Sequence, residues 1–354
     1  MIFSKSFKNK TVLVTGHTGF KGSWLALWLH MLGAKVIAIS KNVPTIPSHY
    51  ENFSDFFISD NKFDLSDFDQ LYSIISKRKP DFVFHLAAQP LVLESYKDPF
   101  ETYNSNTIAT LNILESLKKS NHNSSAIIIT SDKCYENINK QIKYKENDRL
   151  GGIDPYSTSK ASAELIIKGY YESFFKTSKS NVRICSARAG NVMGGGDWAK
   201  YRIIPDFIKS WVSKKELIIR NAKATRPWQH VLEPLSGYLT LASLLSANLK
   251  LNGESFNFGP SDLDSYTVED LIIEVATFFP GSKWSIEDKK NKLYEANLLS
   301  LDCGKAEKIL SWKSKLNFNQ TAEWTSKWYH SYYAEGPEAA VNLTKKQIND
   351  YSND

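Results

Sequence analysis

The sequence is poor in cysteine and has no strong excess of either charge. Its three cysteines, Cys134, Cys185 and Cys303, form no CxxC pair, so neither a disulfide framework nor a thiolate zinc site is expected. The seven histidines form no HExxH motif, and we expect no metal site. The 44 basic and 38 acidic residues leave a net charge of +6 without a basic block, so we expect no nucleic-acid partner.

Long apolar runs are also missing. The apolar segment 24–39 is interrupted by His30 and Lys35, and nothing reaches the length of a membrane span. The first ten residues lack the apolar stretch of a secretory signal. We therefore expect no membrane partner, and the few unpaired cysteines favour a reducing compartment, the cytoplasm. The 354 residues are 42% apolar and 23% charged, which is typical of a globular protein.

Short apolar runs alternate with helical patterns through the first half of the chain. The pattern predicts helices over 20–32, 101–119 and 157–176, and buried strands over 11–15, 35–39, 82–86, 126–130 and 182–187. Strands that alternate with helices form βαβ units. The sequence therefore predicts an α/β fold with a Rossmann-type, doubly wound parallel sheet.

The pattern changes after residue 190. Helices are expected over 203–213, 233–248 and 267–279, and short strands over 216–220 and 255–258. We predict a first domain over 1–190, joined by segments that return later, and a smaller mixed α/β lobe over 191–336. Residues 337–354 are polar, and we expect a C-terminal tail that frays.

Three glycines lie between the first strand and the first helix. Gly16, Gly19 and Gly22 occur in TGHTGFKG. Glycine lets the backbone approach a pyrophosphate, and the helix N-terminus supplies N–H donors. This context predicts a bound NAD or NADP. An acidic residue at the end of the second strand would favour NAD, but Ser40 and Lys41 stand there, so the choice between the two cofactors stays open.

A tyrosine and a lysine four residues apart form the strongest catalytic candidate. Tyr156 and Lys160 in YSTSK share one face of the predicted helix. A nearby ammonium group is expected to lower the pKa of the tyrosine, which could then remove a proton from a substrate hydroxyl group. Ser131, Asp132 and Lys133 follow the strand over 126–130, at the sheet edge where ligands bind.

The motifs together resemble the extended short-chain dehydrogenase/reductase superfamily, and within it the CDP-glucose branch of the sugar-nucleotide 4,6-dehydratases. The resemblance covers nearly the whole chain, through VTGHTGFKGSWLALWL, HLAAQPLV, TSDKCYEN, DPYSTSK, RAGNVMGGGDWA and RPWQHVLEPLSGYL. Lys21 and the Ser131-Asp132-Lys133 run are marks of that branch. Leu93-Glu94, which follows HLAAQPLV, departs from the superfamily, which commonly has arginine after that motif.

The resemblance implies a first domain that binds NAD, with NADP not excluded, and a second lobe that binds a nucleotide sugar, a CDP-hexose. It also implies a homodimer or higher homo-oligomer, paired through helices 101–119 and 157–176. The expected substrate-binding residues are Gln89, Ser131, Asn191, Arg202 and Arg226. The expected cofactor-binding residues are Gly16, Thr18, Gly19, Phe20, Lys21, Gly22, Ser40, Asp64, Leu65, Leu86, Ala87, Ala88, Gln89, Tyr156 and Lys160.

The implied reaction is that of a lyase, which converts CDP-D-glucose to CDP-4-keto-6-deoxy-D-glucose and water by internal hydride transfer. Tyr156 and Lys160 would open it at the 4-hydroxyl group, and Asp132 would protonate the leaving 6-hydroxyl group. The base at C5 stays open, because relatives have glutamate where this chain has Lys133. Other readings are a dehydratase for a dTDP-, GDP- or UDP-hexose, a sugar-nucleotide 4-epimerase, and a binding protein that holds NAD without turnover. The product would serve deoxyhexoses of a surface polysaccharide.

Overall fold

A computed structural model describes residues 1–138, 140, 142–219, 221–260, 266–287 and 299–353. Its centre is a seven-stranded sheet in the order β11-β6-β5-β4-β1-β2-β3, in which every neighbouring pair is parallel. The predicted fold class is therefore confirmed. The strands are β1 (Thr11–Thr15), β2 (Lys35–Ser40), β3 (Ser59–Lys62), β4 (Phe82–His85), β5 (Ser124–Ile129), β6 (Val182–Ala189) and β11 (Ser255–Phe258).

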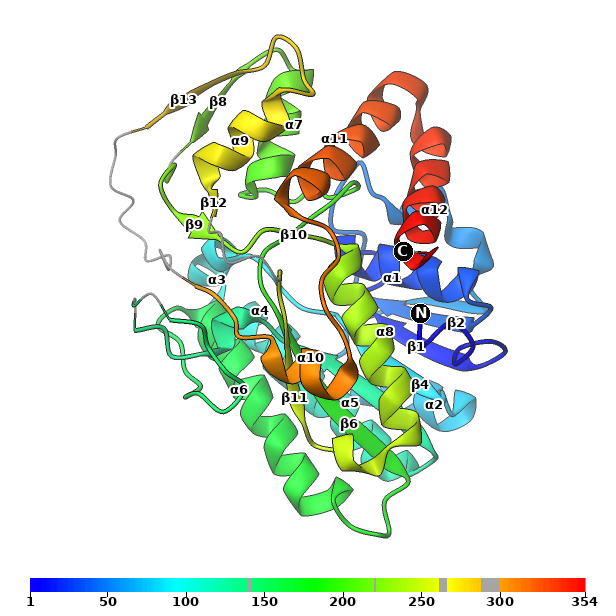
Figure 1. Ribbon diagram of the computed structural model, residues 1–354. Coiled ribbons are helices and arrows are strands. Elements are labelled where there is room, and N and C mark those ends of the chain that lie inside the picture. The colour runs from blue at the N-terminus through cyan, green and yellow to red at the C-terminus, as the bar shows by residue number, and fades with distance from the viewer. Residues whose placement is uncertain (139, 141, 220, 261–265, 288–298, 354) are drawn as a thin grey trace.

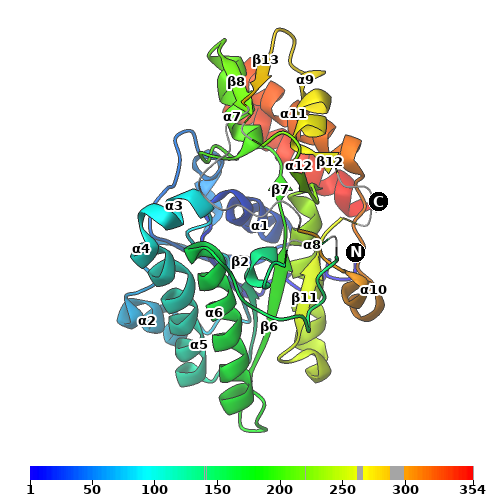
Figure 2. The same cartoon turned by 90° about the vertical axis from the view of Figure 1, so that its left-hand side faces the viewer.

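Helices cover both faces of this sheet (Figures 1 and 2). Successive residues of a strand point to opposite faces, so Leu13 of β1 packs in one apolar core while Val12 and Val14 pack in the other. The first core lies under α2 (Phe68–Arg78), α5 (Ala109–Ser120) and α6 (Pro155–Tyr170), and the second under α1 (Phe20–Met31), α8 (Leu232–Ala247) and α12 (Pro337–Asn353).

The start of α6 is fixed by its own sequence. The Asp154 side chain caps the helix by accepting the backbone N–H of Ser157 at 2.9 Å, and Pro155 occupies the first turn. The predicted helix over 157–176 continues as a π-helical turn, η5 (Tyr171–Phe175). The helix predicted over 101–119 consists of α4 (Pro99–Tyr103), a π-helical turn η3 (Asn104–Ile108) and α5, and α3 (Val92–Lys97) precedes it.

The smaller lobe lies above the carboxyl ends of the strands (Figure 1). It contains the two-stranded sheets β7-β10, β9-β12 and β8-β13. The strand predicted over 216–220 ends at Ile219, and position 220 lies outside the described residues. The elements of this region are β7 (Val192–Met193), α7 (Ile203–Val212), β8 (Glu216–Ile219), β9 (Thr225–Arg226), β10 (Gln229–His230), β12 (Tyr266–Thr267), α9 (Val268–Ala276), β13 (Lys283–Ile286) and α11 (Phe318–Glu335).

Segments from the second half return to the large sheet. Strand β11 pairs with β6, and α8 packs against β5 and β6. The remaining helices are α10 (Gly304–Leu310) and the short 3₁₀ turns η1 (Tyr50–Asn52), η2 (Ser54–Phe56), η4 (Asp132–Cys134) and η6 (Leu249–Leu251). The predicted division into domains at residue 190 stays a prediction. No helix within the described part of the chain is long and apolar enough to cross a membrane.

The expectation of a fraying tail over 337–354 is wrong for the described residues 337–353, which form α12. The polar composition hides a helical repeat of buried positions, among them Val341, Thr344 and Ile348. The Tyr351 ring lies 5.9 Å from the Trp28 ring of α1, so the helix is packed onto α1. Position 354 lies outside the described residues.

Candidate active site

The glycine loop has the shape that a pyrophosphate needs. Gly16 has a φ of +76°, and a side chain at Gly22 would place its Cβ 2.0 Å from the carbonyl oxygen of Gly16. Helix α1 begins after Gly19 without a side-chain cap and without an acidic residue in its first turn. Its first N–H groups and its positive dipole end therefore suit the phosphates of a dinucleotide.

The end of β2 is held from within the protein. The Ser40 hydroxyl accepts the backbone N–H of Thr18 at 3.3 Å and lies 2.9 Å from Nδ1 of His17. Lys41 lies between two carboxylates, 2.8 Å from Asp64 and 2.9 Å from Glu101. One cation between two anions leaves a net negative charge, which disfavours a 2′-phosphate and favours NAD over NADP.

The segment after β4 lies beside the glycine loop, but not all of it reaches the cavity. A Cβ on Gly16 would lie 2.6 Å from the backbone nitrogen of Ala87, next to Leu86 and Ala88. The Gln89 side chain is bonded within the protein, to the Leu91 backbone and, at 2.9 Å, to the Thr102 hydroxyl group of α4. Leu65 is buried in the apolar core beside α2 and α5.

A cavity of about 890 Å³ lies between the sheet edge and the smaller lobe. Of the predicted catalytic residues, Ser131, Asp132, Lys133 and Tyr156 line it, while Lys160 lies behind them. The buried Oδ2 atom of Asp132 has no hydrogen-bond partner among the described residues. A buried carboxylate oxygen without a partner is costly, so its position at the cavity is that of a group that meets a ligand.

The expected lowering of the Tyr156 pKa is not found in the protein alone. Burial raises the pKa of Tyr156 to about 12, which outweighs the lowering by a hydrogen bond with Ser131. Lys160 directs its Nζ to the carbonyl oxygen of Ile129 at 3.5 Å instead. Burial and the neighbouring Lys21 lower the pKa of Lys160 to about 8. The tyrosine hydroxyl is therefore protonated before the cofactor and substrate bind.

Lys21, which we expected at the cofactor, also lies near Asp132 and Arg202. It lines the cavity, and burial lowers its pKa to about 8, with Arg202 lowering it and Asp132 raising it. An aliphatic residue at this position would remove a positive charge from the surroundings of Asp132.

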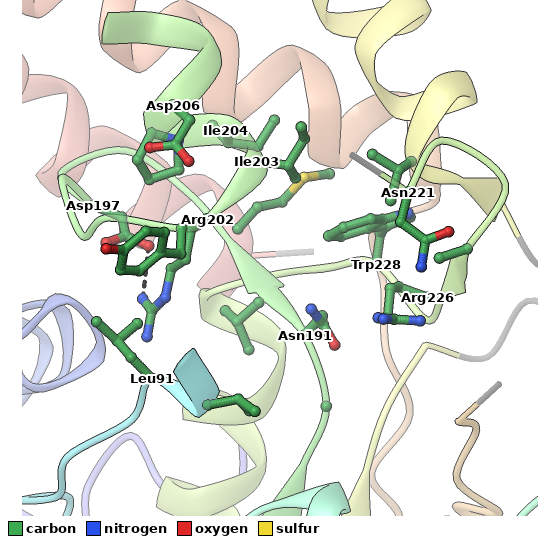
Figure 3. Close-up of a pocket in the computed structure, with 18 of the residues that line it drawn as sticks. Leu91, Asn191, Asp197, Arg202, Ile203, Ile204, Asp206, Asn221, Arg226 and Trp228 are labelled. Atoms are coloured by element: carbon green, nitrogen blue, oxygen red, sulfur yellow. Dashed lines mark hydrogen bonds and ion pairs between the residues drawn. The ribbon is translucent and has the colours of Figure 1, made fainter. Parts of the chain in front are cut away.

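The other predicted substrate residues approach the cavity from the smaller lobe. Figure 3 shows Arg202 and Arg226 on opposite sides of Asn191, and all three line the cavity. Arg202 is held by Asp197, with 2.7 Å between Nη1 and Oδ2. Arg226 is buried on β9 and donates from Nη1 to the carbonyl oxygen of Thr225 at 2.8 Å. Two guanidinium groups around one cavity suit a diphosphate.

Sequence reasoning missed the wall of the cavity beyond Arg226. Leu217, Asn221, Trp228 and Ile286 contribute to it, from β8, β13 and the loops that follow β8 and β9. Leu217, Ile218 and Ile219 of the predicted strand 216–220 all line the cavity, and their apolar run was the signal that the sequence offered. Nothing in the sequence pairs that strand with β13. No group of histidine, cysteine and acidic residues in the described part of the chain could hold a metal ion.

The chain was compared with known families and proteins. The sequence profile of the GDP-mannose 4,6 dehydratase family matches residues 13–325. The chain belongs to this family. The CDP-glucose 4,6-dehydratase of Salmonella typhimurium is 42% identical over 356 aligned residues, which cover 99% of this chain and 98% of that protein. The predicted resemblance to sugar-nucleotide 4,6-dehydratases is therefore confirmed.

Solved structures agree with the family's fold. The epimerase Mth375 of Methanothermobacter thermautotrophicus has a TM-score of 0.81 at 24% identity, covering 98% of this chain and 97% of that one. The dTDP-glucose 4,6-dehydratase of Bacillus anthracis, solved in complex with NAD, has a TM-score of 0.73 at 22% identity, covering 93% and 99%. At these identities the likeness concerns the fold alone.

Proposed function

We propose that the protein converts CDP-D-glucose to CDP-4-keto-6-deoxy-D-glucose and water, with NAD as cofactor. The observation that carries this proposal is the 42% identity, over nearly the full length of both chains, to a CDP-glucose 4,6-dehydratase. The cavity supports it, because a tyrosine, a serine and a carboxyl group line it together with two arginines. Lys41, paired with Asp64 and Glu101, supports NAD.

The residues divide the reaction between them. Bound NAD would be held by the glycine loop and the N-terminus of α1, and it would supply the hydride acceptor for C4 and, once reduced, the hydride donor for C6. Tyr156 takes the proton from the 4-hydroxyl group, while Ser131 hydrogen-bonds the same oxygen. The 4-ketone acidifies the proton at C5, which is removed for the elimination and returned to C5 when C6 receives the hydride. Lys133 lines the cavity next to Asp132 and is the residue to test as the base there.

Asp132 protonates the 6-hydroxyl group as it leaves, because hydroxide is a poor leaving group. Its free Oδ2 atom is the oxygen that would carry this proton. Arg202 and Arg226 hold the diphosphate, since a planar guanidinium group can donate two parallel hydrogen bonds to phosphate oxygens. A substrate held at its diphosphate is positioned for reaction at C4, C5 and C6.

The test is incubation with CDP-, dTDP-, GDP- and UDP-glucose, and with GDP-mannose, followed by mass spectrometry. The proposal expects loss of one water from CDP-glucose at a higher kcat/KM than from the others. Faster loss of water from another nucleotide hexose would change the substrate. A product of unchanged mass and inverted C4 would instead identify a 4-epimerase.

We further propose a cytoplasmic homodimer, formed through α5 and α6. These helices contact each other and lie on an outer side of the sheet (Figure 2). Two large apolar side chains are exposed there: Leu165 on α6 is 59% exposed, and Ile108 before α5 is 41% exposed. A second copy that buries them would remove apolar area from water. Light scattering of Leu165→Glu should show a monomer where the parent protein is a dimer.

A further inference from the structure

Glu164 of α6 and Arg188 of β6 form an ion pair near the carboxyl end of β5. Nε and Nη2 of Arg188 donate to Oε1 and Oε2 of Glu164 at 2.9 and 2.7 Å. The side chain of Arg188 is only 3% exposed, and that of Glu164 only 2%. Oε1 also accepts the Thr130 hydroxyl group, and Oε2 accepts the Ser186 hydroxyl group at 2.9 Å. Both carboxylate oxygens therefore accept two hydrogen bonds each.

The guanidinium group is equally well satisfied. Its Nη1 atom donates to the Tyr135 hydroxyl at 2.8 Å and to the carbonyl oxygen of Glu146 at 3.0 Å. Its Nη2 atom also donates to the Ser255 hydroxyl at 3.2 Å, so all five N–H groups have an acceptor. The pair thus connects α6, β6 and β11 with Thr130 at the end of β5 and with the chain segment that follows it.

Such a pair fixes positions more than it adds stability. Removing two charges from water costs about as much as their attraction returns, and apolar residues of similar volume often stabilise a core as well. The hydrogen bonds, however, allow only one relative placement of the elements that they join. The question is which placement this pair holds.

The pair lies one helical turn behind the catalytic residues. Tyr156, Lys160 and Glu164 occupy successive turns on one face of α6. Lys160 approaches the carbonyl oxygen of Ile129, and Glu164 accepts from the adjacent Thr130, which directly precedes Ser131. The bond to Thr130 therefore sets the position of α6 along β5, and with it the placement of Tyr156 relative to Ser131.

We propose that Glu164, held by Arg188, is a positioning residue for the first step of the reaction, which places Tyr156 and Lys160 against Ser131 and keeps an anion next to the Lys160 ammonium group. The inference rests on the proposed oxidation at C4. It assigns Glu164 no contact with substrate or cofactor, since it does not line the cavity.

The charge of Glu164 gives the inference a second observable. Lys160 is surrounded by Glu164 and Tyr156 of its own helix, Lys21 of α1, His85 of β4 and Cys134 of η4. Glu164 and Cys134 raise the pKa of Lys160, and Lys21 lowers it. Without the Glu164 charge that pKa falls further, so the ammonium form is lost at a lower pH. The alkaline limb of the rate profile should move to lower pH.

The first experiment compares the parent enzyme with Glu164→Gln and with the double variant Glu164→Leu/Arg188→Met. The double variant leaves no unpaired buried charge, so it is expected to unfold near the parent's midpoint. We expect kcat to fall about 10- to 100-fold in both, because a small misplacement of reacting groups has effects of that size. KM for the nucleotide sugar should change less than about threefold in both. The alkaline limb should move down by about half a pH unit or more in Glu164→Gln, which loses the anion but keeps the Arg188 cation.

Two further comparisons keep the test decisive if the core variants fold poorly. Thr130→Val removes only the hydroxyl bond to Glu164, so it should lower kcat. Thr130→Ser keeps a hydroxyl group, so its kcat should stay at the parent's value. Glu233→Gln is the matched control, because Glu233 is a buried carboxylate whose partners are the backbone at Lys315 and Leu316 and the Tyr351 hydroxyl. It should leave the alkaline limb in place.

Parent-like kcat in the double variant, or in Thr130→Val if the double variant does not fold, would overturn the inference. An unmoved alkaline limb in Glu164→Gln would overturn it too. An equal shift of the limb in Glu233→Gln would also do so, because the effect would then belong to any lost carboxylate. All variants are assayed on the nucleotide hexose that the parent enzyme turns over. A wrong CDP-glucose assignment therefore appears in the parent enzyme, and a wrong inference appears in the variants.

Discussion

The Ser131 hydroxyl group donates a hydrogen bond of 3.0 Å to Oδ1 of Asp132. The backbone N–H of Lys133 donates to the same hydroxyl group at 3.2 Å, so both side chains are held at the end of β5. Only Oδ2 of the carboxyl group is left without a partner among the described residues. The group that we propose to bind the 4-oxygen thus orients the group that we propose as the acid for the 6-oxygen.

Replacement of Asp132 by asparagine should separate oxidation from elimination. Asn keeps the shape of the side chain but has no carboxylic proton to give. We expect Asp132→Asn to form reduced nicotinamide from bound CDP-glucose and to lose water about 10²–10⁴ times more slowly than the parent. Absorbance of the reduced cofactor, followed together with the substrate mass, checks this. Water loss at the parent's rate would make Asp132 a structural residue.

Tyr156→Phe should abolish the first step while leaving binding intact. The ring still fills its buried place, but no oxygen remains to accept the proton, so turnover should fall by about 10²–10⁴-fold. Reduced nicotinamide should not accumulate, in contrast to Asp132→Asn. Single-turnover absorbance and calorimetric titration with CDP-glucose are the measurements. Near-normal turnover would remove Tyr156 from the mechanism.

Arg226→Lys tests the grip on the diphosphate. Lysine keeps the positive charge but cannot donate the paired hydrogen bonds of a planar guanidinium group. Affinity for CDP-glucose should fall by about 1.5–3 kcal/mol, with kcat affected less than KM. Titration with CDP and with cytidine separates the contributions, because only the first carries a diphosphate. Equal affinity of parent and variant for CDP would place Arg226 outside the binding site.

The double variant Asp64→Asn/Glu101→Gln should weaken the preference for NAD. Lys41 would lose both anionic partners and could then pair with a 2′-phosphate. We expect the ratio of NADP to NAD affinity to rise about tenfold or more, the scale of a hydrogen bond to a charged group. Adding Lys41→Ala to the double variant should cancel the gain. If the ratio stays at the parent's value in the double variant, Lys41 does not face the ribose.

Buried histidines should make the fold sensitive to acid. Burial lowers the pKa of His49 to about 3, and of His17 to about 4, below the 6.5 expected in an unfolded chain. The unfolded state therefore binds protons that the folded state refuses, and stability falls as the pH drops below 6.5. Each such group should contribute about 1.4 kcal/mol per pH unit.

His49→Gln is the variant for that measurement. Glutamine can replace the bonds to the Ser23 and Thr344 hydroxyl groups, at 2.9 and 3.1 Å, without titrating. Urea unfolding at several pH values between 7.5 and 4.5 should show a shallower loss of stability in this variant than in the parent. Identical slopes would mean that the pKa of His49 is the same in the folded and the unfolded chain.

Local sequence patterns predicted the large sheet and the glycine loop well. A buried parallel strand is a short apolar run, and a dinucleotide loop needs glycine at fixed places, so both leave a signal in neighbouring residues. The arrangement of Ser131, Asp132 and Tyr156 around one cavity also followed, because carboxyl ends of parallel strands share one edge.

Features that depend on distant partners could not be predicted. Lys41 left the choice between NAD and NADP open in the sequence, and only the fold shows that Glu101, far along the chain, pairs with it. Strand β3 is polar, with the sequence SDNK, and its pairing with β2 has no apolar signature. The raised pKa of Tyr156 reflects burial by the assembled structure, which the spacing of Tyr156 and Lys160 does not report.

Helix α12 completes the packing around α1 only at the end of the chain. Its Thr344 hydroxyl group bonds to His49 beyond β2 and to Trp328 of α11, and its Tyr351 bonds to Glu233 of α8. The ribosome synthesises β1 and α1 early, but α12, which packs against α1, emerges only after the whole smaller lobe. The nascent chain therefore exposes the apolar face of α1 through most of its synthesis, and chaperone demand should be greatest in that interval.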